Sequence, residues 1–233
     1  PFARVAFVTD PSSGTCSPSS VGSTTQVNGM WGFPGPSGIS QAFIVTSNAN
    51  VDYWSPPSAP FQLYQVGTGN DNMRSLDGIP PVPRVACGWF FDGVLHPRVW
   101  IDRGGGLNPE PAVEPLLGTG LALYSARMPR ANLAYACGDK GTVVAWDGGT
   151  WYRLPPPAAE LPDLNSITAF DEGHVYVAGF GKDASWVWQW NGSFWKPVMR
   201  VDYDAGSIRA VGGTAPDDLW AVGKGNAWHL SAP

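Results

Sequence analysis

The sequence predicts an all-β fold, a single five-bladed β-propeller of four-stranded antiparallel blades. The 233 residues include 29 Gly, 23 Pro and 12 Trp, but only 14% of them are charged. This composition disfavours helical bundles and doubly wound α/β folds. Tryptophans also recur at intervals of 38 to 46 residues, and a four-stranded propeller blade takes about 40–50 residues. These anchoring tryptophans are Trp54, Trp100, Trp146, Trp190 and Trp228.

The fourth repeat shows the predicted blade most clearly. Apolar alternation predicts strands over residues 166–169, 174–178, 185–190 and 193–198. The turn between the last two is Asn191-Gly192, a strong hairpin signal, and Asp147-Gly148 occupies the same place in the third repeat. Each repeat therefore reads as an antiparallel four-stranded sheet.

The repeats place the five blades at about 25–66, 70–113, 119–157, 164–200 and 206–231. The last repeat stops after its third strand, and an apolar alternation over 2–9 precedes the first repeat. We expect the 2–9 strand to close the ring, which would also cover an open sheet edge. Six blades, or part of a larger ring, are the alternatives. Residues 10–24, which include Cys16, are predicted to form an exposed loop.

Residues 208–223 carry a recognisable repeat motif, IRAVGGTAPDDLWAVG, and NGMWGF at 28–33 is a diverged copy of its opening. The motif resembles the VWAVG…WDG…W repeats of bacterial secreted and cell-surface propellers. It is also similar to tectonin repeats and to tachylectin-type five-bladed lectins. The resemblance implies a propeller in the extracellular space or at the cell envelope, and it implies no single activity.

Charge and hydrophobic run length argue against nucleic-acid binding and against a membrane-spanning helix. The net charge is −5 and no basic stripe is present, so nucleic acid is not an expected ligand. No apolar run reaches about 18 residues, so the sequence predicts no membrane-spanning helix.

The sequence predicts neither an enzyme nor a metal or cofactor site. His96, His174 and His229 occupy different positions of the repeat, which disfavours a shared metal or a catalytic triad. Most acidic residues fall in turns, where Asp bonds to its own backbone. Cys87 and Cys137 occupy equivalent positions of two repeats, and we expect buried free thiols there.

Aromatic residues beside polar turns are the candidate ligand-binding groups. Indole rings can pack on the C–H faces of sugars while neighbouring polar groups bind hydroxyls, and repeated weak sites give avidity. The alternative is that the rings fill the wedges between blades. Trp151 and Trp195 are expected to be the most exposed. The candidate sugar-binding residues are Trp146, Asp147, Trp151, Trp190, Asn191 and Trp195.

A second group, Trp89, Phe90 and Phe91, lies outside the repeat pattern and is a candidate partner interface. The main functional prediction is a non-enzymatic, lectin-like module that binds a glycan or surface polysaccharide. The alternative is a structural or scaffold subunit that docks onto another protein of a larger assembly. A glycan-cleaving enzyme is the third and least favoured hypothesis.

Overall fold

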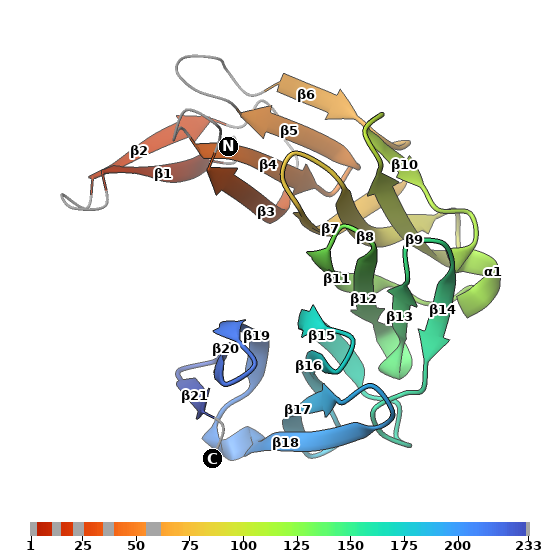
Figure 1. Cartoon of the computed structure of the whole chain (residues 1–233), viewed down its shortest axis with the longest axis vertical. Coiled ribbons are helices and arrows are strands. Elements are labelled where there is room, and N and C mark those ends of the chain that lie inside the picture. Colours follow the sequence, from red (N-terminus) through yellow and green to blue (C-terminus); the bar gives the residue numbers. More distant parts are fainter. Residues whose placement is uncertain (1–3, 11–14, 21–25, 35–39, 55–61, 232–233) are drawn as a thin grey trace.

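The computed structural model describes residues 4–10, 15–20, 26–34, 40–54 and 62–231. Five small antiparallel sheets follow one another along an arc around a common axis, as the blades of a β-propeller (Figure 1). Consecutive strands of each blade are neighbours in its sheet, so every pairing joins segments that are close in sequence. The all-β, five-bladed prediction is confirmed.

The first two blades lie in the amino-terminal half of the chain. Blade 1 contains β3 (Val27–Pro34), β4 (Ser40–Thr46), β5 (Asn50–Trp54) and β6 (Gln62–Gln65). Blade 2 contains β7 (Asp71–Gly78), β8 (Arg84–Phe91), β9 (Leu95–Asp102) and β10 (Leu107–Pro109). A short helix, α1 (Val113–Leu117), follows blade 2. No helix in the described ranges has the length and hydrophobicity needed to cross a membrane.

The last three blades follow. Blade 3 contains β11 (Leu123–Arg130), β12 (Leu133–Gly138), β13 (Val143–Trp146) and β14 (Trp151–Leu154), with the 3-10 turn η1 (Asp139–Gly141). Blade 4 contains β15 (Asp163–Asp171), β16 (His174–Phe180), β17 (Ala184–Trp190) and β18 (Trp195–Asp202). The turn η2 (Tyr203–Ala205) leads to blade 5, which contains β19 (Ile208–Ala215), β20 (Asp218–Gly223) and β21 (Ala227–Ser231).

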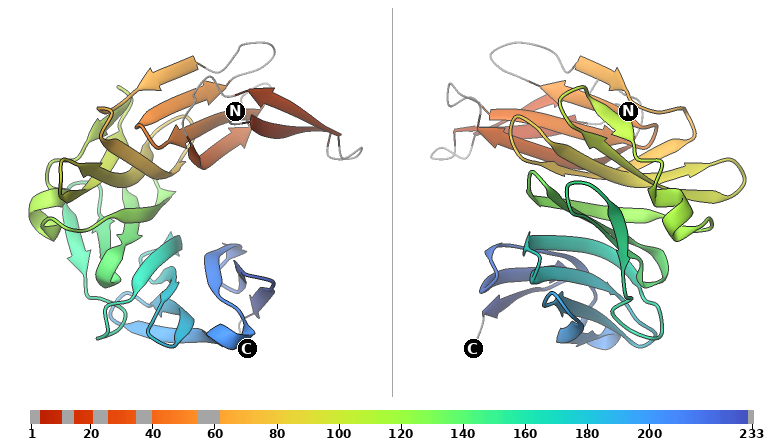
Figure 2. Two further views of the ribbon diagram at one scale, coloured as in Figure 1. Left: turned by 180° about the vertical axis from the view of Figure 1, so that it is seen from behind. Right: turned by 45° about the vertical axis from the view of Figure 1, so that its right-hand side comes forward.

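The amino-terminal strand does not close the ring. β1 (Arg4–Asp10) pairs antiparallel with β2 (Thr15–Ser20), and the blade 5 sheet has three strands, in the order β19-β20-β21. The expected closing strand is therefore wrong, as is the expected loop over 10–24, part of which is β2. A four-residue connection makes the hairpin inexpensive in chain entropy, whereas ring closure joins opposite ends of the chain. The hairpin and blade 5 lie at opposite ends of the arc (Figures 1 and 2).

A shared glycine fixes the register of the second strands. It lies opposite an apolar residue of the first strand in each of blades 2 to 5. Counting back from this glycine, the first and third residues face the following blade, while the second and fourth face the preceding one, as alternation requires. The glycines are Gly88, Gly138, Gly179 and Gly223.

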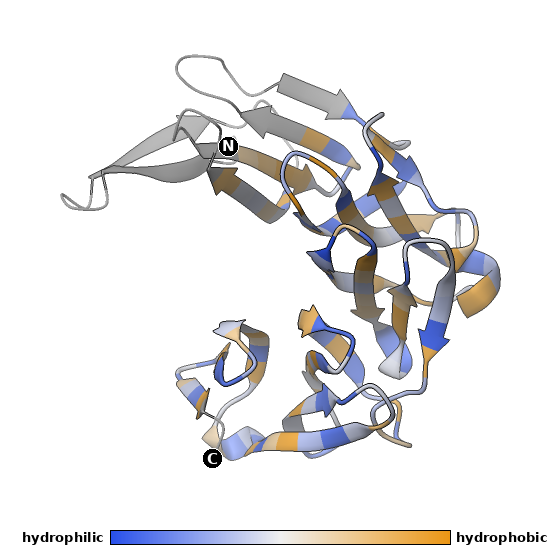
Figure 3. Cartoon of the chain, viewed as in Figure 1, coloured by the Kyte–Doolittle hydropathy of each residue, from blue (hydrophilic) through white to orange (hydrophobic). Residues whose placement is uncertain are grey.

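The core consists of apolar layers between successive blades. Val85 and Cys87 of blade 2 pack with Ala134 and Ala136 of blade 3. The next two layers repeat this arrangement, between blades 3 and 4 and between blades 4 and 5. Apolar segments accordingly recur along the strands of successive blades (Figure 3). Cys87 and Cys137 are buried free thiols, as expected.

A serine on the first strand links each of blades 2 to 4 to its successor. The Oγ of Ser75 accepts a hydrogen bond from the backbone N–H of Ala126 (3.1 Å), and Ser166 Oγ accepts one from Val211 N–H (3.0 Å). Ser125 acts likewise between blades 3 and 4. The corresponding residue of blade 5, opposite Val222, is Ala210. The repeated bond therefore ends at blade 5.

The strand pairings correct the sequence alignment of the anchoring tryptophans. Trp146 and Trp190 pair with the second-strand residue four positions before the shared glycine. Trp100 and Trp228 instead pair with the residue two positions before the glycine, which is Ala86 in blade 2 and Ala221 in blade 5. In blade 5 the position of Trp190 is held by Leu230, which pairs with Leu219. The sequence alone did not reveal this shift because alternation is unchanged by a two-residue slip.

Candidate functional site

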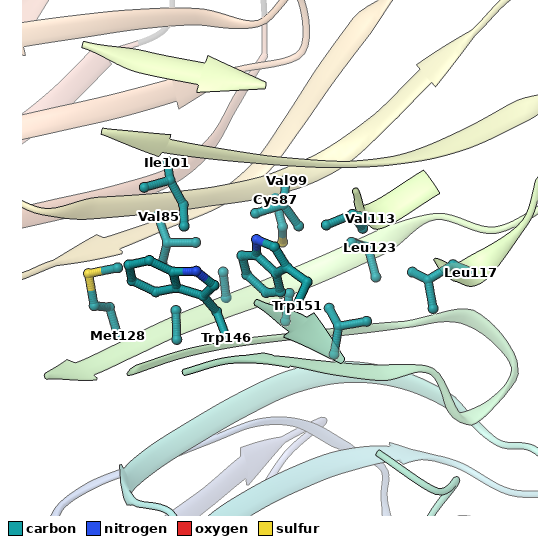
Figure 4. Close-up of a cluster of buried hydrophobic side chains, with 14 of the residues drawn as sticks. Val85, Cys87, Val99, Ile101, Val113, Leu117, Leu123, Met128, Trp146 and Trp151 are labelled. Carbon is teal, nitrogen blue, oxygen red and sulfur yellow. The ribbon is translucent and has the colours of Figure 1, made fainter. Parts of the chain in front are cut away.

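The predicted sugar-binding tryptophans of blade 3 belong to the wedge between blades 2 and 3, whereas Asp147 lies in an exposed turn. Trp146 and Trp151 are buried, with rings 6.4 Å apart among the apolar side chains shown in Figure 4. The expectation that Trp151 is exposed is wrong, since 6% of its surface is accessible. Its indole Nε1 donates to Glu110 Oε2 of the segment after β10 (3.1 Å). Asp147 accepts hydrogen bonds from the turn, including Thr150 N–H (2.7 Å).

Blade 4 repeats this arrangement. Trp190 is buried, and the half-buried Trp195 packs against it with ring centroids 5.4 Å apart. Trp195 Nε1 donates to the carbonyl oxygen of Pro155 in blade 3 (2.7 Å). Asn191 Oδ1 accepts the backbone N–H groups of its own turn, such as that of Phe194 (3.0 Å). In both blades the first residue of the fourth strand thus reaches back to the preceding blade.

The second predicted group does not form one patch. Alternation along β8 places Trp89 and Phe91 on one side and Phe90 on the other. Trp89 meets Tyr124 of blade 3 edge to face (5.9 Å), and Phe90 lies beside His96 (5.7 Å). Phe91 is the exposed member of the three, with 50% of its surface accessible.

The structure brings a different set of residues together, in a groove of about 740 Å³ between blades 4 and 5. Tyr176, Val198 and Met199 line it from blade 4, and Leu219 and Leu230 line it from blade 5. The middle of β18 is correspondingly apolar in Figure 3. Polar residues complete the lining: His174, Gln189, Lys196, Asp217 and His229. An apolar floor with a few polar groups is the usual character of a binding site.

Two histidine–aspartate pairs border this groove. His174 Nδ1 lies 2.9 Å from Asp171 Oδ1, and His229 Nε2 lies 2.9 Å from Asp218 Oδ1. Hydrogen bonds from Thr214 and then His229 lower the pKa of Asp218. Burial raises the pKa of Asp171, but its hydrogen bonds, foremost that from His174, outweigh this and lower the pKa overall. Both acids are therefore anionic partners that orient an imidazole at the surface.

One face of blade 5 is open. Trp220 and Val222 lie three and one positions before Gly223, and 47% and 42% of their surfaces are accessible. The corresponding residues of blades 2 to 4 are at most 5% accessible because the following blade covers them. These residues are Val85, Cys87, Tyr135, Cys137, Tyr176 and Ala178.

His229 connects the open face to the groove. Its ring stacks on the indole of Trp220, with centroids 4.6 Å apart, and it also lines the groove. Trp220 and Val222 lie on the face of blade 5 opposite the one that packs on blade 4, and His229 is the residue that this face shares with the groove lining. The alternation of β20 places two large apolar residues on the face opposite blade 4, as in the blades where this face is buried, so the sequence pattern does not distinguish an open face from a covered one.

A further cavity lies at the axis of the arc. A cavity of about 500 Å³ is bordered by the first strands of all five blades, and its one acidic lining residue in the described ranges is Asp77. Burial raises the pKa of Asp77, although Arg127 (3.3 Å) opposes the shift, and Met128 N–H donates to it (2.7 Å). Glycoside hydrolysis ordinarily needs two carboxylates facing each other. No cluster of possible metal ligands occurs among the residues that the structure describes.

Comparisons with known proteins support the fold but show no family to which the chain belongs. No protein-family profile matches the sequence, and no curated protein matches it. Among solved structures, the chain is similar to YCF48 bound to a D1 peptide, with a TM-score of 0.65 and 16% identity over 93% of this chain and 70% of that one. It is also similar to YCF48 from Cyanidioschyzon merolae, with a TM-score of 0.60 and 13% identity over 90% and 68%. At this identity the likeness establishes the propeller fold alone.

Proposed function

We propose that this chain is a non-catalytic, protein-binding propeller that docks onto a larger assembly through the open face of blade 5. The observation that carries the proposal is the exposure of Trp220 and Val222 at positions that the other blades bury. The equivalent faces of blades 2 to 4 are covered by aliphatic side chains of the next sheet, such as Ala134, Val177 and Leu219. The expected partner is therefore a folded protein with an apolar sheet surface.

The chemistry of the open face supports an interface held by apolar contacts. Ala210 stands where the other blades carry the bridging serine, so a partner meets methyl and indole groups instead of a hydroxyl. Contiguous exposed apolar residues on a soluble protein commonly mark an interaction surface. The similar YCF48 structure is titled as bound to a D1 peptide, which is consistent with a polypeptide partner for this propeller as well.

The lectin-like hypothesis remains a prediction without a favouring observation. Its tryptophans lie mostly between blades, where they contact the preceding blade and not an open surface. A location in the extracellular space or at the cell envelope is likewise a proposal, which rests on the resemblance of the repeat motif.

The open face can be tested by comparing two lysine substitutions. Trp220→Lys should remove a partner that co-purifies with the tagged chain from its native source. Phe194→Lys, at a turn residue with 59% of its surface accessible, should retain it. Calorimetry with the purified partner should then show at least about tenfold weaker binding for Trp220→Lys, which is about 1.4 kcal/mol.

Two results would contradict docking through the open face. Equal affinity of the partner for wild type and Trp220→Lys would refute the open face as the docking site. Binding on a glycan array that disappears with Trp195→Ala would instead support the lectin-like hypothesis.

A further inference from the structure

In blades 3 and 4, two directly paired tryptophans belong to the wedge toward the preceding blade. One is the last residue of the third strand, and the other is the first residue of the fourth strand. Directly paired residues share one face of a sheet, and the blade 3 pair lies in one apolar cluster with Val85 and Val99 of blade 2 (Figure 4). The pairs are Trp146–Trp151 and Trp190–Trp195.

Blade 2 has different residues at these two positions. Asp102 ends β9, Leu107 begins β10, and the two pair directly. Asp102 also pairs with the residue four positions before the shared glycine, as the first tryptophan of each pair does in blades 3 and 4. Trp100 does not replace either ring, because it holds the position that Trp188 occupies in blade 4 beside that blade's own pair.

The wedge between blades 1 and 2 accordingly contains a groove of about 580 Å³. Its apolar lining consists of Phe43, Val51, Val66 and Leu107. In the strand register, Phe43 and Val51 correspond to the two valines that lie beside the tryptophan pair of blade 3. The groove between blades 1 and 2 therefore has the walls of a wedge that holds two indoles in the next repeat. It lies between two four-stranded blades, away from blade 5.

Arg84 gives this groove its charge. Its guanidinium carbon lies 4.2 Å from the ring centroid of Phe43, and it forms an ion pair with Asp102. The Asp102 side chain is fully buried and also accepts hydrogen bonds from the backbone N–H groups of Gly104 (2.7 Å) and Gly106 (2.9 Å). The carboxylate is thus turned inward, whereas Arg84 lines the groove with further N–H donors. A ligand is therefore expected to present an acceptor here, and above all an anionic one.

We propose that the groove between blades 1 and 2 binds a small planar aromatic acid, with its ring between Phe43 and Leu107 and its carboxylate on Arg84. The ring takes the space that indoles fill in blades 3 and 4, and the guanidinium recognises the carboxylate. The volume of about 580 Å³ lies in the range of small-molecule sites, which is about 300–1,000 Å³. This site goes beyond the proposed function, because it takes a small molecule at blades 1 and 2.

The test uses the intact purified chain and 5-fluoroindole-3-acetate, observed by fluorine NMR. Titration should show saturable binding with a Kd of about 1 mM or below, as for a ligand of this size. Neutral 5-fluoroindole should bind at least about fivefold more weakly, because it lacks the group that Arg84 recognises. Cyclohexylacetate, an acid without a planar ring, should not displace the probe at equal concentration.

A variant that fills the groove locates the binding. Leu107→Trp introduces the residue that blades 3 and 4 have at this position, so it should abolish probe binding while the melting temperature stays at or above that of wild type. Phe194→Trp is the matched control, because it adds a tryptophan at a turn residue with 59% of its surface accessible. It should bind the probe within about twofold of wild type, as expected for a distant site. Val66→Phe is a second filling variant should Leu107→Trp fail to fold.

Three results would overturn the proposal. The first is no saturable binding to the wild-type chain. The second is equal binding to a folded filling variant, which would place the probe at another site. The third is equal affinity for neutral 5-fluoroindole or displacement by cyclohexylacetate, either of which would contradict recognition of an aromatic acid. All these measurements leave Trp220 and Val222 unchanged and use no partner protein, so their failure is distinct from failure of the open-face interface.

Discussion

Replacing Gly138 with alanine should destabilise the propeller strongly, because the first two strands of blade 3 approach each other closely there. A Cβ at this residue would lie 1.9 Å from the carbonyl oxygen of Ala122 and 2.8 Å from Leu123 Cα, where ordinary contacts begin at 3.4 Å. Both neighbours are backbone atoms, and the Ala122 oxygen would have to move by more than an ångström to restore an ordinary contact. Overpacking of this kind costs about 1–3 kcal/mol, and losing the Leu123–Gly138 pairing adds about 1 kcal/mol. The expected loss of stability is therefore about 2–4 kcal/mol.

The assay is thermal and guanidinium unfolding followed by tryptophan fluorescence and circular dichroism. For 233 residues, about 2–4 kcal/mol corresponds to a fall in melting temperature of about 5–15 °C. Gly105→Ala is the matched control, because no heavy atom lies within 4 Å of its added Cβ. It should change stability by less than about 1 kcal/mol. A melting temperature of Gly138→Ala within 2 °C of wild type (roughly 1 kcal/mol or less), or an equal loss in the control, would refute the steric reasoning.

Three further expectations follow from buried polar groups. Ser166→Ala leaves the buried N–H of Val211 without its 3.0 Å acceptor and should cost about 1–3 kcal/mol in denaturant titrations; a neutral effect would contradict the serine linkage. Burial raises the pKa of Cys87 and Cys137, so Ellman's reagent should label neither thiol at pH 8 in the native state and both in guanidinium; rapid native labelling of either would contradict its burial. Burial raises the pKa of Asp102, but its hydrogen bonds, foremost that from the backbone N–H of Gly104, outweigh burial and lower the pKa overall. Its contribution to stability is thus present above the unfolded pKa of about 3.9 and is lost as pH falls through the lower folded value; Asp102→Asn should flatten the loss of stability below about pH 4, and an unchanged acid profile would contradict it.

The candidate site illustrates how far sequence patterns reach. The turns at Asp147 and Asn191 form as their Gly-containing motifs predict, because Asx side chains bond to their own backbone whatever surrounds them. The tryptophans next to them are packed between blades, which the sequence left open against ligand contact. Alternation gives the face on which a side chain lies, but it does not identify what covers that face.

The groove and the open face could not be assigned from sequence for the same reason. Tyr176 and Trp220 occupy equivalent positions of two repeats, and both look like core residues in the alternation. One is buried because a neighbouring blade packs on it, and the other is exposed at the end of the arc. Exposure here depends on contacts between sheets that lie about 40 residues apart, and local patterning carries no record of them.

The sequence by itself determined the elements of this protein: a β-rich composition, five repeats near the length of a blade, the turns within each, and the absence of a helical core. These follow from local conformational preferences and from the period of apolar residues. The tertiary structure decided the pairing of β1 with β2, the two-residue shift of Trp228 relative to Trp190, and the open edge and face of blade 5. The physical reason is that register and edge exposure depend on which strands meet in space, and alternation with a period of two is satisfied equally well by several pairings.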